Sequence, residues 1–171
     1  THTDLFKIIK KKLIYKNILI EKPICHFNDK SSSKILLRNN NKNIFCGYNH
    51  SVNNSFKFFY NKASLKIEKI DVINVNWKEN FKGILGAHPW LKNEFDSYLG
   101  SIYEGGGSRQ EHSHGIRLLN IILKLKKIKA NKLNFNKNLI FKRNNKIKYD
   151  CFCNISTYTK KLFIMYETDL L

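Results

Sequence analysis

Acidic residues, proline and cysteine are all scarce in this sequence of 171 residues. Asp and Glu total 13 against 31 Lys and Arg, so the formal net charge is +18 and the isoelectric point lies near 9.8. The few carboxylates are scattered, and they form no convincing pair for general acid–base catalysis. A basic excess of this size is typical of proteins that bind nucleic acid or an anionic membrane surface.

Long apolar runs are missing as well. The most hydrophobic stretch, 115–128, is interrupted by Arg117, Lys124, Lys126 and Lys127. A membrane-spanning helix needs about 20 mostly apolar residues, so the sequence predicts none. With 42% apolar residues, slightly below the usual range of about 45–50% for globular proteins, the chain should form one ordinary domain with long polar segments.

The four cysteines, Cys25, Cys46, Cys151 and Cys153, are irregularly spaced. They could pair as disulfides in a secreted protein, or assemble a zinc site over long range. A Cys-x-Cys without a second cysteine pair is a weak zinc signal. The sequence therefore favours free, buried thiols in a reducing compartment.

Three of the eight glycines are consecutive: Gly105, Gly106 and Gly107. We expect them between a strand over Phe95–Tyr103 and a helix that Ser108 opens, with Glu111 completing a capping box. Glycines at such a junction can expose amide groups to a phosphate, or simply form a tight turn. Both interpretations remain open, but the spacing is not that of a nucleotide-hydrolysing loop.

The segment after the glycines has helical periodicity. Ile116, Leu119, Ile122 and Leu123 fall on one face, and Arg117, Asn120, Lys124 and Lys127 fall on another. This pattern predicts an amphipathic helix with a buried face and a basic stripe. Elsewhere we expect short strands at 34–37 and 44–46, strand character or an insertion within 55–77, and loops over 81–91.

From residue 131 onward the periodicity fails, and we predict an extended basic tail. Between Arg117 and Lys161 there are thirteen Lys or Arg residues and one acidic residue, Asp150. Cations that neutralise phosphates alternate with tyrosines that can stack on bases. The predicted RNA-binding residues are therefore Gly105, Gly106, Gly107, Arg117, Lys124, Lys127, Lys142, Arg143, Lys146, Lys148, Tyr158, Lys160 and Lys161.

Glu111, His112 and His114 could suggest a metal centre. Two histidines two residues apart do not share a helix face, and the spacing is not His-Glu-x-x-His. Histidines that face solvent or RNA near the start of a helix are favoured. The sequence predicts no metal, no cofactor and no enzymatic activity.

Several short motifs follow one another in a fixed order. They are Lys30–Ile35, Ile44–Gly47, Pro89–Leu91, Phe95-Asp96, Gly105–Gln110, His114–Arg117, Leu139–Arg143 and Thr157–Lys161. In this order they resemble the ninth protein of the small ribosomal subunit. The chain departs from that family in a shorter spacing from glycine loop to helix, in Arg143 where the family has Asp, in an insertion near 57–87, and in the extension 162–171.

The resemblance implies an α/β (α+β) fold, in which a small mixed sheet packs against helices as in the second domain of the fifth small-subunit protein. An N-terminal extension (1–29) would precede the core domain (30–133), and a basic tail with its extension (134–171) would follow. The implied partners are ribosomal RNA, other small-subunit proteins and the peptidyl-site transfer RNA, but no membrane. The many Lys, Asn and Ile residues, which have A/T-rich codons, suit a mitochondrial ribosome.

Two alternatives stay open. Ile116-Arg117-Leu118-Leu119-Asn120 is similar to a helix of the eleventh small-subunit ribosomal protein. His88-Pro89 followed by Leu91-Lys92 is similar to part of a non-catalytic subunit of respiratory NADH dehydrogenase. A metal-dependent enzyme that uses His112 and His114 is the least favoured class.

Overall fold

The computed structural model describes Leu5, Ile8 and residues 17–22, 44–145, 147–159 and 161–170. Several predictions fall elsewhere in the chain and lie outside the described residues. They concern most of the N-terminal extension, Cys25, the motif at Lys30–Ile35, the strand at 34–37, and the cations Lys146 and Lys160.

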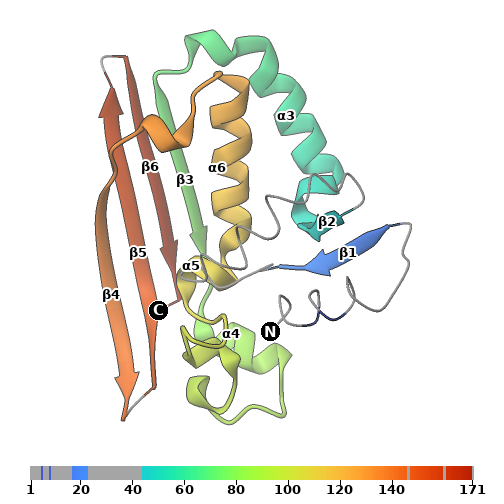
Figure 1. Ribbon diagram of the computed structural model, residues 1–171, viewed down its shortest axis with the longest axis vertical. Helices are drawn as coiled ribbons and strands as arrows, with labels where there is room; N and C mark the ends of the chain where they lie inside the picture. The colour runs from blue at the N-terminus through green and yellow to red at the C-terminus, as the bar shows by residue number, and fades with distance from the viewer. Residues whose placement is uncertain are drawn as a thin grey trace.

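The larger of two sheets has four strands in the order β3-β6-β5-β4 (Figure 1). They are β3 (Val72–Lys78), β6 (Leu162–Asp169), β5 (Ile147–Thr159) and β4 (Asn136–Asn144). β3 runs parallel to β6, and the other neighbours are antiparallel. The predicted mixed α/β fold, with a small mixed sheet packed against helices, is confirmed.

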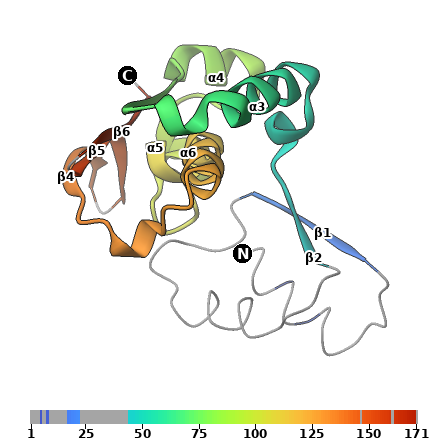
Figure 2. The same cartoon turned by 90° about the horizontal axis from the view of Figure 1, so that it is seen from above.

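The helices lie on one side of this sheet (Figures 1 and 2). They are α3 (Asn54–Lys66), α4 (Phe81–Ala87), α5 (Ser108–Glu111) and α6 (Ser113–Leu125), and short 3-10 turns connect them: η1 (Asn49–Val52), η2 (Ile67–Lys69), η3 (Glu94–Asp96), η4 (Tyr98–Gly100) and η5 (Ala130–Lys132). Of the helices, α5 and α6 lie directly against the sheet and α3 lies further out. None of the helices in the described ranges is long and apolar enough to cross a membrane.

The amphipathic helix predicted after the glycines is confirmed as α6. Its buried residues Leu119, Ile122 and Leu123 pack against Ile73 and Ile164 of the sheet, within one apolar cluster. A second cluster lies at the other end of β5, where the ring of Tyr149 packs between the rings of Phe81 and Phe95. The sheet therefore anchors both the α6 segment and the turns that precede it.

The smaller sheet consists of β1 (Ile18–Glu21) and β2 (Ile44–Gly47), which pair in parallel. The strand predicted at 44–46 is thus confirmed. In Figure 1 the arrow of β1 points toward α5. As a result the end of β1 delivers Glu21 and Lys22 to the junction of α5 and α6.

The strand expected over Phe95–Tyr103 is absent, and the 3-10 turns η3 and η4 occupy this segment. The side chain of Asn93 accepts a hydrogen bond from Phe95 N (2.8 Å), and Ser97 Oγ accepts one from Leu99 N (3.2 Å). Such local bonds from Asn and Ser favour turns over strands. They prevail here over the alternation of apolar residues that suggested a strand.

The extended tail expected from residue 131 is instead the sheet itself. The described residues between 136 and 169 form β4, β5 and β6, joined by antiparallel pairing. In β6 the inward side chains Leu162, Ile164, Tyr166 and Thr168 are buried, and the alternate ones are half-buried. This period-two pattern is hard to see in the sequence because the alternate positions of β6 also hold apolar residues, Phe163 and Met165.

Two other stretches also differ from expectation. Within 55–77 the strand begins only at Val72, because Leu65 belongs to α3 and Ile67 to η2. The loops expected over 81–91 contain α4, whose start is capped by Asn80 accepting a hydrogen bond from Lys82 N (2.7 Å). Helices thus occupy stretches where strand character and loops were expected.

Gly115 on α6 offers a test of this packing. A Cβ there would lie 2.7 Å from Cε2 of the fully buried Tyr166. We expect Gly115→Ala to lower the free energy of unfolding by about 1–2 kcal/mol, because overpacking outweighs the helix propensity gained. Gly83 on α4 has nothing within 4 Å of an added Cβ, so Gly83→Ala should raise stability by about 0.5–1 kcal/mol.

Urea denaturation of both variants beside the unaltered protein measures the difference. A Gly115→Ala protein as stable as Gly83→Ala would show that α6 does not sit this close to β6.

Candidate functional site

The glycine loop forms a tight turn. Gly105 and Gly107 have φ angles of 101° and 87°, which favour glycine. The amide of Gly106 donates to Ser101 O (2.9 Å), and that of Gly107 donates to Leu99 O (3.0 Å). Since these two amides are used within the loop, they are not available to a phosphate, and the structural interpretation of the triple glycine prevails.

A polar cluster follows the loop, at the start of α6. Lys22 Nζ, at the end of β1, donates to Glu111 O (2.9 Å) and to Glu111 Oε1 (3.1 Å). The side chains of Lys22 and Glu111 are only 14% and 18% exposed. Tyr98 OH donates to Glu111 Oε2 (3.3 Å). We call Glu21, Lys22, Tyr98, Glu111 and His114 the Lys22 cluster.

His114 brings an imidazole to this cluster. Its ring stacks on Trp77 (centroids 5.5 Å apart) and meets the edge of His50 (4.5 Å). Burial lowers the pKa of His114 to about 4, and the positive charges of Lys22 and His50 act in the same direction. Its Nδ1 is buried and has no hydrogen-bond partner among the described residues. His114 is therefore neutral at physiological pH.

Tyr98 closes the cluster on the side of the 3-10 turns. Burial, together with the negative charges of Glu111 and Glu21, raises the pKa of Tyr98 to about 12. Its phenol therefore keeps its proton and acts as a hydrogen-bond donor.

His112 lies behind the cluster and is fully buried. The Thr168 hydroxyl donates to Ser108 O (3.3 Å), so its oxygen accepts a hydrogen bond from His112 Nδ1 (2.5 Å). Nε2 lies 2.8 Å from Glu79 Oε2, without the alignment of a hydrogen bond. Burial lowers the pKa of His112, and the nearby Glu79 carboxylate opposes that shift. This histidine ties the helix junction to the sheet.

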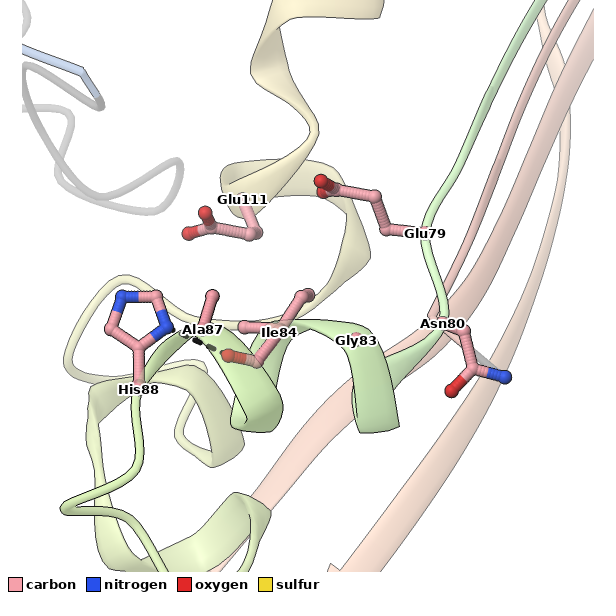
Figure 3. A pocket seen from close by; sticks show the side chains of 7 residues that line it. All are labelled: Glu79, Asn80, Gly83, Ile84, Ala87, His88 and Glu111. Carbon is pink, nitrogen blue, oxygen red and sulfur yellow. Dashed lines mark hydrogen bonds between the residues drawn. The ribbon is translucent and has the colours of Figure 1, made fainter.

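A pocket of about 260 Å³ opens between α4 and α5 (Figure 3). Its lining residues are Glu79, Asn80, Gly83, Ile84, Ala87, His88 and Glu111. Figure 3 shows Glu79 and Glu111 on the α5 side, facing the helix that carries Ile84. Because Glu111 also belongs to the Lys22 cluster, the pocket and the cluster are adjacent.

Two further kinds of site to consider are a metal centre and a reactive cysteine thiol. Across the described ranges no group of three His, Cys, Asp or Glu side chains is placed to hold a metal ion. Cys151 and Cys153 are free and buried, as predicted, whereas Cys46 is only half-buried. Burial raises the pKa of the Cys151 thiol, and it raises that of Cys153 to about 11, so both stay protonated and unreactive.

The residues predicted to bind RNA are dispersed. The guanidinium of Arg117 lies over the Tyr48 ring, 6.0 Å from its centroid, and Lys124 lies seven residues further along α6. Exposed Lys127 follows that helix. The others lie on the far strands: Lys142 and Arg143 on β4, Lys148 and Tyr158 on β5, and Lys161 in the turn to β6. Their contact with RNA stays a prediction, as do the protein and transfer-RNA partners and the mitochondrial location.

Sequence reasoning missed the central member of the site, Lys22, and two of its neighbours, His50 and Trp77. Lys22 is one of 31 cations, and nothing in composition distinguishes it. The available signal was its position directly after the short apolar run Ile18–Ile20, since functional side chains gather where parallel strands end. Glu111, His112 and His114 were noticed, but only as an unconvincing metal centre.

No protein-family model matches the sequence, and no curated protein matches it. The fold is similar to part of a solved structure from Bacillus subtilis, of a protein named "putative oxidoreductase yvaA". The TM-score is 0.62 at 14% sequence identity, and the match covers 99% of this chain and 42% of that one. The chain thus spans less than half of the length of that protein, and at this identity the likeness shows the fold alone.

This likeness contradicts the predicted role in the small ribosomal subunit, together with its alternatives, and the prediction that the chain is not an enzyme. The physical reason is visible in the strands. Thr157–Lys161 was expected to be the end of a tail that reaches transfer RNA, but Thr157 and Thr159 pair with Ile164 and Leu162 inside the sheet. The fold is one that a protein named as an oxidoreductase also uses.

Proposed function

We propose that this chain forms the substrate-binding part of an oxidoreductase that interconverts an alcohol and a carbonyl compound. The observation that carries the proposal is the Lys22 cluster, where a cation lies near enough to a neutral imidazole to affect its pKa, beside a pocket that Glu79, Glu111 and Asn80 help to line. The likeness to part of a protein named as an oxidoreductase supports the class of reaction.

Oxidation of an alcohol removes a proton and a hydride from the substrate. The hydroxyl O–H bond breaks and releases a proton, and the neighbouring C–H bond breaks and releases a hydride to a separate acceptor. As the hydride leaves, the oxygen becomes part of a carbonyl group and its proton becomes strongly acidic. The imidazole of His114 is neutral, so it has a free nitrogen lone pair that can accept that proton as the hydride leaves.

Lys22 has the complementary role. Its ammonium group lies in a site that is mostly shielded from water, and Glu111 holds it there through two acceptors. A fixed positive charge stabilises the partial negative charge that develops on the substrate oxygen when the proton leaves. In the reverse reaction the same charge polarises the carbonyl group.

The pocket favours a small substrate with several hydroxyl groups. Glu79, Glu111 and Asn80 supply oxygen atoms that accept hydrogen bonds from hydroxyls, and Ile84 and Ala87 supply an apolar side. Its volume of about 260 Å³ is below the range of about 300–1,000 Å³ that is common for drug-sized ligands.

The roles of His114 and Lys22 account for the transfer of the proton, but not for the transfer of the hydride. The amides of Gly106 and Gly107 donate within the loop, so the triple glycine does not fit the phosphates of a dinucleotide. We therefore assign the hydride acceptor no residues on this chain.

The proposal predicts that Lys22→Met and His114→Asn each lower the rate of alcohol oxidation by about a hundredfold to ten-thousandfold. The assay offers a panel of small polyols with NAD⁺, NADP⁺ or FAD as the acceptor. Lys78→Met is the matched control, because Lys78 is 55% exposed and pairs with Glu167 on the sheet. Full activity in both cluster variants would exclude the proposed roles.

The neutral state of His114 also predicts how stability depends on pH. Its pKa is lower in the folded protein than in the unfolded chain, so protons bind preferentially to the unfolded chain. The stabilisation is complete above about pH 6.5 and is lost as the pH falls toward about 4. We expect a loss of about 1–2 kcal/mol from His114, allowing for solvent screening.

Unfolding by urea at several pH values measures this effect. His114→Asn should flatten the decline between about pH 6.5 and 4. A variant whose stability falls as steeply as that of the unaltered protein would contradict a neutral His114.

A further inference from the structure

A fully buried carboxylate holds the start of α5, the helix that carries Glu111. Asp150 on β5 is 0% exposed. It accepts hydrogen bonds from Ser108 Oγ (2.9 Å), Arg109 N (3.0 Å), Arg109 Nε (3.1 Å) and Arg109 Nη2 (3.2 Å). All four donors belong to two consecutive residues, so a single side chain of the sheet fixes the first turn of the helix.

The glycine loop makes this approach possible. A Cβ on Gly107 would lie 2.6 Å from Asp150 Oδ1, and one on Gly106 would lie 2.1 Å from Tyr98 O. Neither position can carry a side chain without displacing the carboxylate or the turn. The glycines therefore bring the backbone against Asp150.

α5 depends on this contact because it has four residues, and helices of that length are not stable by themselves. The residue before it, Gly107, offers no side-chain cap, and Asp150 takes that part by accepting from Arg109 N. At its far end, Tyr166 OH donates to His112 O (3.1 Å). The orientation of α5 is thus set from β5 at one end and from β6 at the other.

We propose that Asp150 is a positioning residue for the reaction assigned to the Lys22 cluster. It holds the start of α5, and through α5 it fixes the position of Glu111 relative to Lys22. It also keeps water away from His114. Asp150 has no hydrogen bond to a member of the cluster among the described residues, and its catalytic meaning rests on the proposed function.

The test is Asp150→Asn, which keeps the size of the side chain and removes its charge. The imidazole of His114 reports on the site, and its titration can be followed by ¹H–¹⁵N NMR, with His114→Asn identifying its signal. The titratable groups that face His114 are Lys22 and Glu21 from the end of β1, Tyr48 before η1, His50 from η1 and Glu111 from α5. All of them remain in the variant.

We expect the titration midpoint of His114 to rise from about 4 by about one pH unit, because a loosened α5 admits water and burial is the largest cause of the low pKa. With a substrate from the polyol panel, kcat should fall about tenfold to a hundredfold while KM changes less than about threefold.

Leu162→Ala is the control for a loss of stability alone. Leu162 is buried at the start of β6, opposite Thr159 and away from α5, so this variant should unfold more easily and leave the titration of His114 unchanged. If Asp150→Asn does not fold, Arg109→Lys replaces it, since that change keeps the charge and removes the paired contacts of Nε and Nη2. It should move the midpoint in the same direction by a smaller amount.

A folded Asp150→Asn protein in which His114 still titrates near 4 would overturn the positioning role and leave the proposed function intact. Conversely, failure of the Lys22→Met and His114→Asn tests would remove the proposed function, and the NMR result would still show whether Asp150 sets the geometry of the site.

Discussion

The contact between Asp150 and the first turn of α5 joins the two parts of the molecule. On one side is the four-stranded sheet, which is stabilised by pairing and by apolar packing against α6. On the other is a polar junction that has little apolar burial of its own. A buried charge is tolerated only when its partners are close and well directed, and Arg109 with Ser108 meets that condition. The position of the junction follows from it.

The candidate site shows how a strongly basic chain makes use of few acids. Glu111 accepts bonds from Lys22 and Tyr98 and also lines the pocket, while Glu79 lies beside His112. Both of these carboxylates therefore have a specific neighbour, although the whole chain has 31 Lys and Arg residues and only 13 Asp and Glu residues. The scarcity of acids therefore does not argue against catalysis, because two of the few that are present lie at the candidate site.

The sequence predicted those elements whose structure follows from the pattern of apolar residues within one segment. The periodicity of Leu119 and Ile122 identified α6, because burial of one helix face decides its place. The apolar run at Ile44 identified β2, which is held by pairing with β1 and has no fully buried residue. The predictions failed where contacts distant in sequence decide. Ser108 satisfies the local rule for a helix cap, but its hydroxyl bonds to Asp150 on β5. Likewise Lys22 meets Glu111 only after folding, across 89 positions of the chain.

The lysines and arginine of β4 have a physical consequence apart from any ligand. β4 is an outer strand of the sheet, and on its outer side no strand among the described residues pairs with it. The backbone groups of such an edge could pair with another chain. Lys137, Lys142 and Arg143 are exposed along it, and its register shifts between Ile140 and Phe141. Repulsion between like charges and an irregular edge both oppose the growth of a continuous intermolecular sheet. Part of the positive charge of this protein thus protects it against aggregation.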